Sequence, residues 1–134
     1  MSKTAIVSII MRVLMGAIFL SHGIAKLQMG LGNVDAWFSS IGIPGFLAYV
    51  VTMLELIGGI LMIVGLFTRY VSALFVIMLI GAIATAKLSA GLLGNAQTPG
   101  YELELGYILI SLYLVVANPP ALSLDRLIMN KLSI

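Results

Sequence analysis

Four long apolar runs, broken by very few charges, constrain this chain more than any other feature of its sequence. Of its 134 residues, 61% are hydrophobic and only 9% are charged, whereas a soluble domain carries roughly 25% charged residues. A helix rises about 1.5 Å per residue, so about 20 apolar residues cross the hydrocarbon layer of a bilayer. The runs cover residues 5–25, 46–66, 70–93 and 101–117. We therefore predict an all-α integral membrane protein, a four-helix antiparallel bundle that forms a single domain over residues 1–134.

The connections between the runs predict how the helices follow one another. Residues 27–45 have the glycine-rich and polar composition of a loop, and residues 67–69 are too few to form anything but a tight antiparallel hairpin. Pro119 and Pro120 end the fourth helix, because proline cannot continue it. Ser123 can then cap a short amphipathic tail helix within residues 122–132.

The distribution of Lys and Arg predicts the orientation in the membrane. Four crossings place both termini on one side, and the cationic residues at that end outnumber those at the other. Because cytoplasmic loops of membrane proteins are enriched in Lys and Arg, we expect an N-in, C-in arrangement in the bacterial plasma membrane. Arg69 would then lie in a cytoplasmic loop.

The residue types that the chain lacks argue against several classes of site. It has no cysteine, and its one histidine is His22, so a cysteine-built zinc or iron–sulfur centre is excluded and a multi-histidine metal site is not expected. Its net charge is only +2, with no basic patch that could follow a phosphate backbone. We expect no metal, no built-in cofactor and no nucleic-acid partner.

Ionisable residues inside the runs are costly in lipid and therefore need partners. Counted from the cytoplasmic end at about 1.5 Å per residue, Arg12 lies about 10 Å deep and Glu55 about 16 Å deep. An arginine side chain can span that difference. We therefore predict an ion pair or hydrogen bond between Arg12 and Glu55.

A second group of ionisable residues falls near the opposite end of the helices. His22 and Lys87 lie about 25 Å from the cytoplasmic end, Lys26 follows His22 by one turn, and Glu102 and Glu104 begin the fourth run. The two glutamates are about 200° apart around a helix, so at most one of them faces the bundle. One interpretation is structural, with these groups solvated at the interface. The other is that His22, Lys26, Lys87 and Glu102 line a semi-apolar pocket for a small lipophile with polar oxygens, such as a quinone or phenol.

Several short motifs carry a resemblance to a known family. The most specific is Glu-x-x-Gly-Gly, beginning at Glu55, followed by Gly-Leu-Phe-Thr-Arg at residues 65–69. Further matching positions are Arg12, Gly16, Phe19, His22, Gly23, Lys26 and Leu27, and residues 43–45, 100–102 and 123–125. In their order and spacing, over about residues 8–126, the chain resembles the DoxX family of small four-helix membrane proteins.

The resemblance implies a function as well as a fold. It implies a membrane subunit, rather than a self-sufficient enzyme, in a quinone-linked redox system or in a system that detoxifies catechol-like aromatics and resists oxidative stress. A quinone would be the bound cofactor, and the bilayer, a soluble oxidoreductase or dioxygenase and a second copy of the chain would be the partners. The positions that the resemblance singles out are Arg12, His22, Lys26, Glu55, Arg69 and Glu102. A small-molecule transporter and a membrane scaffold for a cytosolic enzyme stay open as alternatives.

Overall fold

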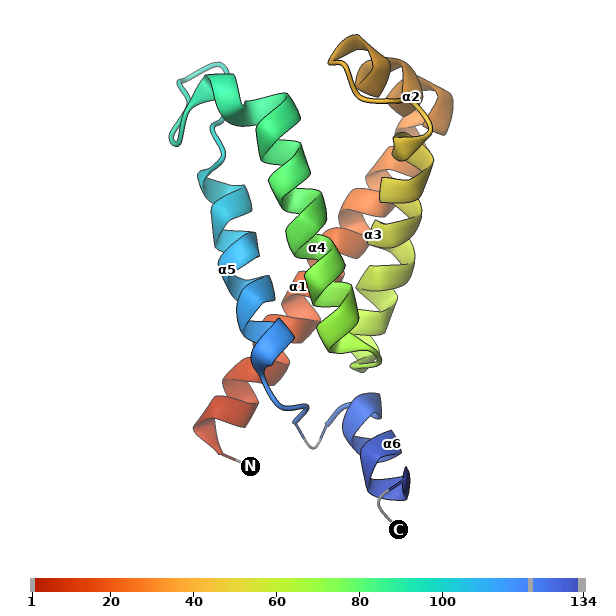
Figure 1. The fold of residues 1–134 in the computed structure, drawn as a ribbon, viewed down its shortest axis with the longest axis vertical. Helices are drawn as coiled ribbons and strands as arrows, with labels where there is room; N and C mark the ends of the chain where they lie inside the picture. Colours follow the sequence, from red (N-terminus) through yellow and green to blue (C-terminus); the bar gives the residue numbers. More distant parts are fainter. Residues whose placement is uncertain (1, 121, 133–134) are drawn as a thin grey trace.

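The computed structural model describes residues 2–120 and 122–132, which form six α-helices and no β-strand (Figure 1). The helices are α1 (Lys3–Met29), α2 (Leu31–Ser40), α3 (Leu47–Val64), α4 (Thr68–Ala82), α5 (Glu102–Val116) and α6 (Leu124–Leu132). After α4 the chain continues as a π-helical turn, η1 (Ile83–Lys87), and a 3-10 turn, η2 (Leu88–Ala90). The prediction of an all-α chain is confirmed.

Among the described residues, three helical segments are long and apolar enough to cross a membrane. They are Lys3–Met29, Leu47–Val64 and Thr68–Ala90, and they correspond to the first three predicted runs. α5 lies within the fourth run but has 15 residues, which gives a length of about 22 Å against the about 30 Å of hydrocarbon. The structure thus contains three candidate spans and a shorter apolar helix.

The outer faces of these helices carry large apolar side chains. Leu14 of α1 is 56% exposed, Ile57 of α3 is 51% exposed and Ile77 of α4 is 67% exposed. Many such residues would form a patch too large for a monomeric soluble protein. Lipid is the environment in which these faces are stable.

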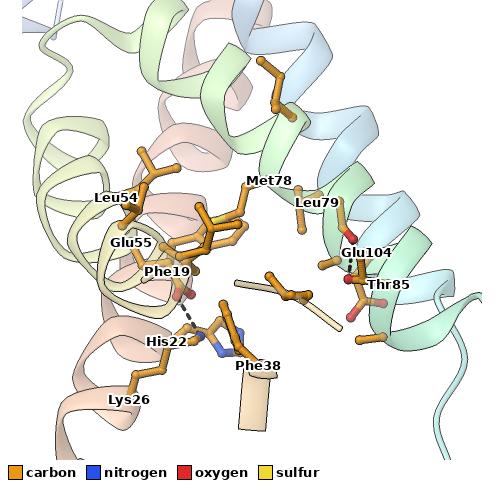
Figure 2. A pocket seen from close by; sticks show the side chains of 18 of the residues that line it. Phe19, His22, Lys26, Phe38, Leu54, Glu55, Met78, Leu79, Thr85 and Glu104 are labelled. Atoms are coloured by element: carbon orange, nitrogen blue, oxygen red, sulfur yellow. Dashed lines mark hydrogen bonds and ion pairs between the residues drawn. The ribbon is translucent and has the colours of Figure 1, made fainter. Parts of the chain in front are cut away.

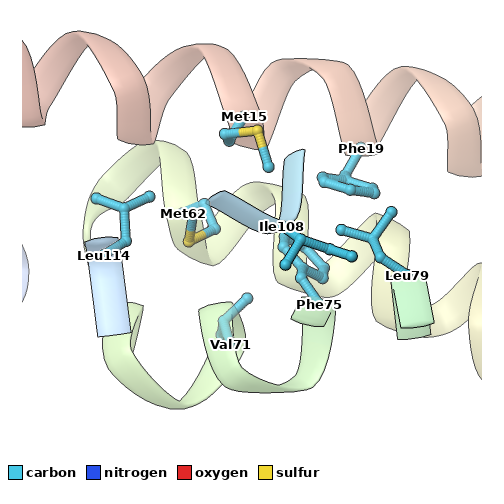
Figure 3. Packing of buried hydrophobic residues seen from close by; sticks show 8 residues of the cluster. All are labelled: Met15, Phe19, Met62, Val71, Phe75, Leu79, Ile108 and Leu114. Atoms are coloured by element: carbon cyan, nitrogen blue, oxygen red, sulfur yellow. The ribbon is translucent and has the colours of Figure 1, made fainter. Parts of the chain in front are cut away.

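The helices associate in two pairs. α1 packs mainly on α3, and α4 packs mainly on α5. The two pairs approach each other near the start of α1 and α6, which we call the closed end, and diverge toward α2 and residues 91–101, which we call the open end (Figure 1). Buried hydrophobic side chains from both pairs form the core between them (Figure 3): Met15, Phe19, Met62, Val71, Phe75, Leu79, Ile108 and Leu114.

A direct backbone contact sets the register of α1 on α3. A Cβ atom on Gly16 would lie 2.6 Å from the carbonyl oxygen of Gly59, and one on Gly59 would lie 2.8 Å from the carbonyl oxygen of Gly16. Small residues allow this approach, which drives helix association in lipid. The contact places Arg12 level with the end of α3 and brings Lys26 beside Glu55.

The segment interpreted as a loop, residues 27–45, contains the helix α2, so that interpretation is wrong. Gly30 ends α1 in a backbone conformation with φ of 90°, which favours glycine. Val34 and Phe38 lie one turn apart on α2 and are buried with Ala48 of α3. Packing against α3 therefore stabilises a helix whose exposed residues resemble those of a loop.

The tail helix α6 is attached to the turn between α3 and α4. Ser123 caps α6 as predicted, because its Oγ accepts a hydrogen bond from the backbone N–H of Arg126 at 3.1 Å. The carboxylate of Asp125 accepts hydrogen bonds from the backbone N–H groups of Phe67 at 2.7 Å and Thr68 at 3.0 Å. Asp125 thus satisfies donors at the start of α4 that have no partner within that helix.

Candidate functional site

A cavity of about 530 Å³ lies between the two helix pairs, toward the open end. Residues of α1, α2, α3, α4, η1 and α5 line it (Figure 2). Its volume is within the range of about 300–1,000 Å³ that holds small-molecule ligands. Most of the lining side chains are apolar, including Leu47, Val50, Leu54, Leu74, Ile77 and Met78.

Aromatic side chains form part of the cavity wall. Phe19 lies at the inner side, where its ring stacks on that of Phe75 with centroids 4.3 Å apart and meets the edge of Tyr107 at 5.6 Å. Trp37 and Phe38 of α2 line the cavity from the open end, with their centroids 5.4 Å apart. These rings offer faces and edges against which a planar aromatic ligand can pack.

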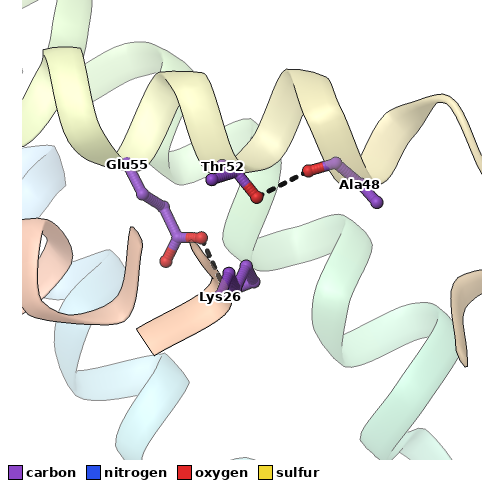
Figure 4. Close-up of polar contacts among 4 residues, drawn as sticks. All are labelled: Lys26, Ala48, Thr52 and Glu55. Carbon is purple, nitrogen blue, oxygen red and sulfur yellow. Dashed lines mark hydrogen bonds and ion pairs between the residues drawn. The ribbon is translucent and has the colours of Figure 1, made fainter. Parts of the chain in front are cut away.

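One wall contains an ion pair between α1 and α3 whose carboxylate is buried. Lys26 Nζ lies 2.7 Å from Glu55 Oε1, and the side chains are 20% and 3% exposed (Figure 4). His22, one turn before Lys26, lines the same wall (Figure 2). Thr52 does not serve Glu55 as a donor, because its hydroxyl donates to the carbonyl of Ala48 at 2.7 Å. Since a buried carboxylate is costly without a charged partner, Lys26 is what stabilises Glu55 here.

The opposite wall contains a second ion pair. Glu104 of α5 lines the cavity, and its Oε1 accepts a hydrogen bond from Nζ of Lys87. The other carboxylate oxygen, Oε2, is buried and has no hydrogen-bond partner among the described residues. Lys87 ends the π-helical turn η1, a kind of turn that is frequent at functional sites. Thr85 of the same turn also lines the cavity.

The structure brings some of the residues named from the sequence to the cavity and leaves others outside it. His22 and Lys26 line the cavity, and Lys87 reaches its edge through the contact with Glu104. Glu102 is exposed and does not line the cavity. The inward-facing glutamate is Glu104, so the choice of Glu102 is corrected.

The sequence contains a signal that identifies the inward glutamate. Tyr107, Ile108 and Ser111 follow Glu104 by three, four and seven positions and therefore share its face of the helix. Ile108 and Ser111 are buried, and Tyr107 lines the cavity. Glu102 lies on a different face, which points to the outside.

The predicted pair between Arg12 and Glu55 is wrong. Arg12 is buried near the closed end, where its Nη2 lies 3.5 Å from the carbonyl oxygen of Ile63. The depth estimate assumed that the two helices begin at the same level, whereas α1 extends well beyond the end of α3. The glycine contact between these helices instead places Lys26 beside Glu55. Arg69 is exposed in the first turn of α4, at the closed end and away from the cavity.

The chemistry of the cavity suits an organic molecule with polar oxygens. Within residues 2–120 and 122–132, no three His, Cys, Asp or Glu side chains gather closely enough to hold a metal ion. The ammonium groups can donate hydrogen bonds, the carboxylates can accept them, and histidine and tyrosine can do both. Apolar walls with a few converging polar groups are typical of sites for such ligands.

Comparison with known proteins identifies relatives of this chain. The family model described as DoxX matches residues 7–88. The "Putative oxidoreductase CatD" of Bacillus subtilis is 43% identical over 118 residues, which cover 88% of this chain and 84% of that protein. The "Uncharacterized membrane protein Rv3486" of Mycobacterium tuberculosis is 35% identical over 132 residues, covering 88% and 78%. The "Inner membrane protein YqjF" of Escherichia coli is 27% identical over 126 residues, covering 92% of each chain.

No solved structure matches the chain. The family model nevertheless covers more than half of it, and the relatives named as membrane proteins agree with the three apolar spans. The chain is therefore a multi-pass bacterial membrane protein that belongs to the DoxX family.

Proposed function

We propose that the chain binds a small aromatic lipophile with oxygen substituents, of the quinone, phenol or catechol class, in the cavity between its helix pairs. The observation that carries this proposal is the buried carboxylate of Glu55, paired with Lys26 in an otherwise apolar wall. Ionisable groups inside a membrane protein are expensive and usually mark a functional site. Here the pair faces a cavity of suitable volume rather than lipid or the tightly packed core.

The aromatic and the charged residues of the cavity walls bind different parts of the ligand. The aromatic rings of Phe19, Trp37 and Phe38 pack against the ring of the ligand and exclude water from it. The charged groups of the two ion pairs form hydrogen bonds with the ligand's oxygens, which are stronger than hydrogen bonds between neutral groups. This combination selects molecules that are apolar enough to dissolve in the bilayer and polar enough to be oriented.

We also propose that the chain acts as the membrane subunit of a redox or aromatic-detoxification system. The word oxidoreductase in the printed name of the Bacillus subtilis relative supports this assignment. A soluble oxidoreductase or dioxygenase would act on the bound molecule or deliver it. The chain itself would concentrate and orient that molecule within the membrane.

A fourth crossing by α5 completes the proposed architecture. α5 packs along α4, and its outer face carries the exposed apolar residues Leu109, Leu112 and Val116. We propose that α5 and the residues flanking it span the bilayer, which gives a four-helix antiparallel bundle with both termini in the cytoplasm. The closed end then faces the cytoplasm and the cavity lies toward the outer face.

A binding site is better supported than a transport pathway. A pathway would connect the polar groups at both depths, from His22 and Glu55 to Arg12. The cavity is lined by His22 and Glu55 but not by Arg12, and the buried side chains of Met15 and Phe19 lie between Arg12 and His22 along α1. These packed residues separate the two groups.

The test is saturable binding of oxygenated aromatics to the purified protein in lipid nanodiscs, measured by isothermal titration calorimetry. Glu104→Gln should weaken binding about tenfold, because a charge-assisted hydrogen bond contributes about 1.5–3 kcal/mol. Glu102→Gln is the matched control, since it makes the same change on the same helix outside the cavity, and should leave affinity unchanged. Absence of saturable binding, or equal affinities in the two variants, would contradict the proposed site. Mass spectrometry of the molecules retained on purification from native membranes would identify the natural ligand and partner.

A further inference from the structure

We infer that the cavity is built for a reduced aromatic ring with hydroxyl groups at opposite ends, a 1,4-dihydroxy compound. It should prefer such a ligand over the isomer with adjacent hydroxyls and over the oxidised 1,4-quinone. The inference rests on the proposed function and narrows its substrate class. It follows from the placement of two carboxylates and from the hydrogen-bonding capacity that they leave unused.

The two carboxylates belong to different helix pairs. Glu55 lies on α3 and Glu104 on α5, and the close-up shows them on opposite sides of the cavity (Figure 2). Each is held by a lysine of its own pair, Lys26 on α1 and Lys87 at the end of η1. Neither wall needs the other to keep its charge compensated, so both carboxylates are available to a molecule between them.

Both carboxylates can accept more hydrogen bonds than they receive. Oε2 of Glu104 accepts no hydrogen bond from any described residue. Glu55 is 3% exposed, and Lys26 Nζ, 2.7 Å from its Oε1, is its charged partner. A carboxylate has about four acceptor positions, so Glu55 keeps capacity for a further donor. Buried acceptors without donors are rare in folded proteins and costly. A ligand that brings two O–H donors would satisfy Oε2 of Glu104 and give Glu55 a second donor beside Lys26.

The requirement for donors distinguishes the redox states of a ligand. The hydroxyls of a hydroquinone donate to carboxylates, whereas the carbonyl oxygens of a quinone can only accept. A quinone would bring no donor to either carboxylate and would place its own partial negative charges against them. The cavity should therefore bind the reduced form more tightly.

The placement of the acceptors distinguishes the isomers. Hydroxyls at positions 1 and 4 point in opposite directions from one ring, so they can reach carboxylates on facing walls. Adjacent hydroxyls point to the same side, so a catechol can satisfy only Glu55 or Glu104 at one time. Phe19 and Tyr107, which line the cavity, provide aromatic surface for the ring between the walls.

The test compares three probes on the wild-type protein in nanodiscs by titration calorimetry. tert-Butylhydroquinone and 4-tert-butylcatechol are isomers of one composition that differ in hydroxyl placement, and tert-butyl-1,4-benzoquinone is the oxidised partner of the first. We expect the 1,4-diol to bind at least about tenfold more tightly than either of the others, the effect of one additional charge-assisted hydrogen bond. Equal affinities of the isomers, tighter binding of the catechol, or a quinone that binds as tightly as the hydroquinone would overturn the inference and leave the proposed function intact. Failure of all three to bind would overturn both.

A variant pair adds a second readout. Glu104→Leu removes one of the two acceptors, so it should reduce the preference for the 1,4-diol over the catechol to less than about threefold, whereas Glu102→Leu should preserve the wild-type preference. A preference that survives Glu104→Leu would show that the two walls do not share the ligand. The wild-type comparison decides the inference even where a variant fails to fold.

Discussion

Replacing Gly59 by alanine should force α1 and α3 apart. A Cβ on Gly59 would lie 2.8 Å from the carbonyl oxygen of Gly16 and 2.8 Å from the backbone nitrogen of Leu20. Ordinary van der Waals contact begins at 3.4 Å, so the backbones must separate by about 0.6 Å. Both atoms belong to the backbone, and no side-chain rotation can relieve the overlap.

The expected cost follows from two opposing effects. Overpacking a tightly packed interface costs about 1–3 kcal/mol. Alanine is a better helix former than glycine by about 1 kcal/mol, which partly offsets that cost. Gly106→Ala isolates the propensity effect, because a Cβ on Gly106 of α5 would meet no atom within 4 Å. The free energy of unfolding of Gly59→Ala should therefore lie about 1–3 kcal/mol below that of Gly106→Ala.

The assay is equilibrium unfolding in mixed micelles with increasing sodium dodecyl sulfate, followed by far-ultraviolet circular dichroism. A Gly59→Ala protein as stable as Gly106→Ala, or more stable, would refute the reasoning. It would show that the contact between α1 and α3 is looser than the geometry indicates. Because the same contact aligns Lys26 with Glu55, the Gly59→Ala protein should also bind oxygenated aromatics more weakly.

Three further predictions test other parts of the structure. Asp125→Ala removes two hydrogen bonds to the start of α4, so it should lower the free energy of unfolding by about 1–2 kcal/mol, with a smaller loss for Asp125→Asn. An Asp125→Ala protein as stable as the wild type would rule out a capping role. Lys26→Met leaves Glu55 buried without a partner and should lower the free energy of unfolding by about 3–5 kcal/mol. The double variant Lys26→Met/Glu55→Leu should recover most of that loss, and a double variant as unstable as the single one would contradict this. The chain lacks cysteine, so a single introduced cysteine reports the side of the membrane on which it lies. Ser40→Cys should react with an impermeant maleimide on intact cells, and Lys131→Cys should react only after permeabilisation. The reverse pattern would exclude the N-in, C-in orientation.

Features that depend on local composition could be predicted from the sequence. The apolar runs predicted the three long helical segments, and the short connection at residues 67–69 predicted the tight turn before α4. Ser123 was identified as the cap of α6 because a serine before a periodic segment satisfies free N–H groups. These features need no knowledge of how one helix lies against another.

Features that depend on packing could not be predicted in the same way. α2 has the composition of a loop, and the burial of Val34 and Phe38 against α3 stabilises it. The partner of Glu55 depends on how far α1 slides along α3, which the contact between Gly16 and Gly59 determines. Counting residues from assumed helix ends cannot detect that offset. The rotation of α5 about its axis can be predicted from the sequence once its buried face is identified. Ile108 and Ser111 mark that face, and Glu104 lies on it.

The division of the two ion pairs between the helix pairs has a consequence for biogenesis. Lys26 and Glu55 both belong to the half of the chain that the ribosome completes first, and Lys87 and Glu104 both belong to the half that follows. Each half can therefore neutralise its own carboxylate while it leaves the translocon, before the other half exists. Glu55 and Glu104 therefore each enter the bilayer after the lysine that pairs with them has been synthesised. The cavity forms only when the two halves dock.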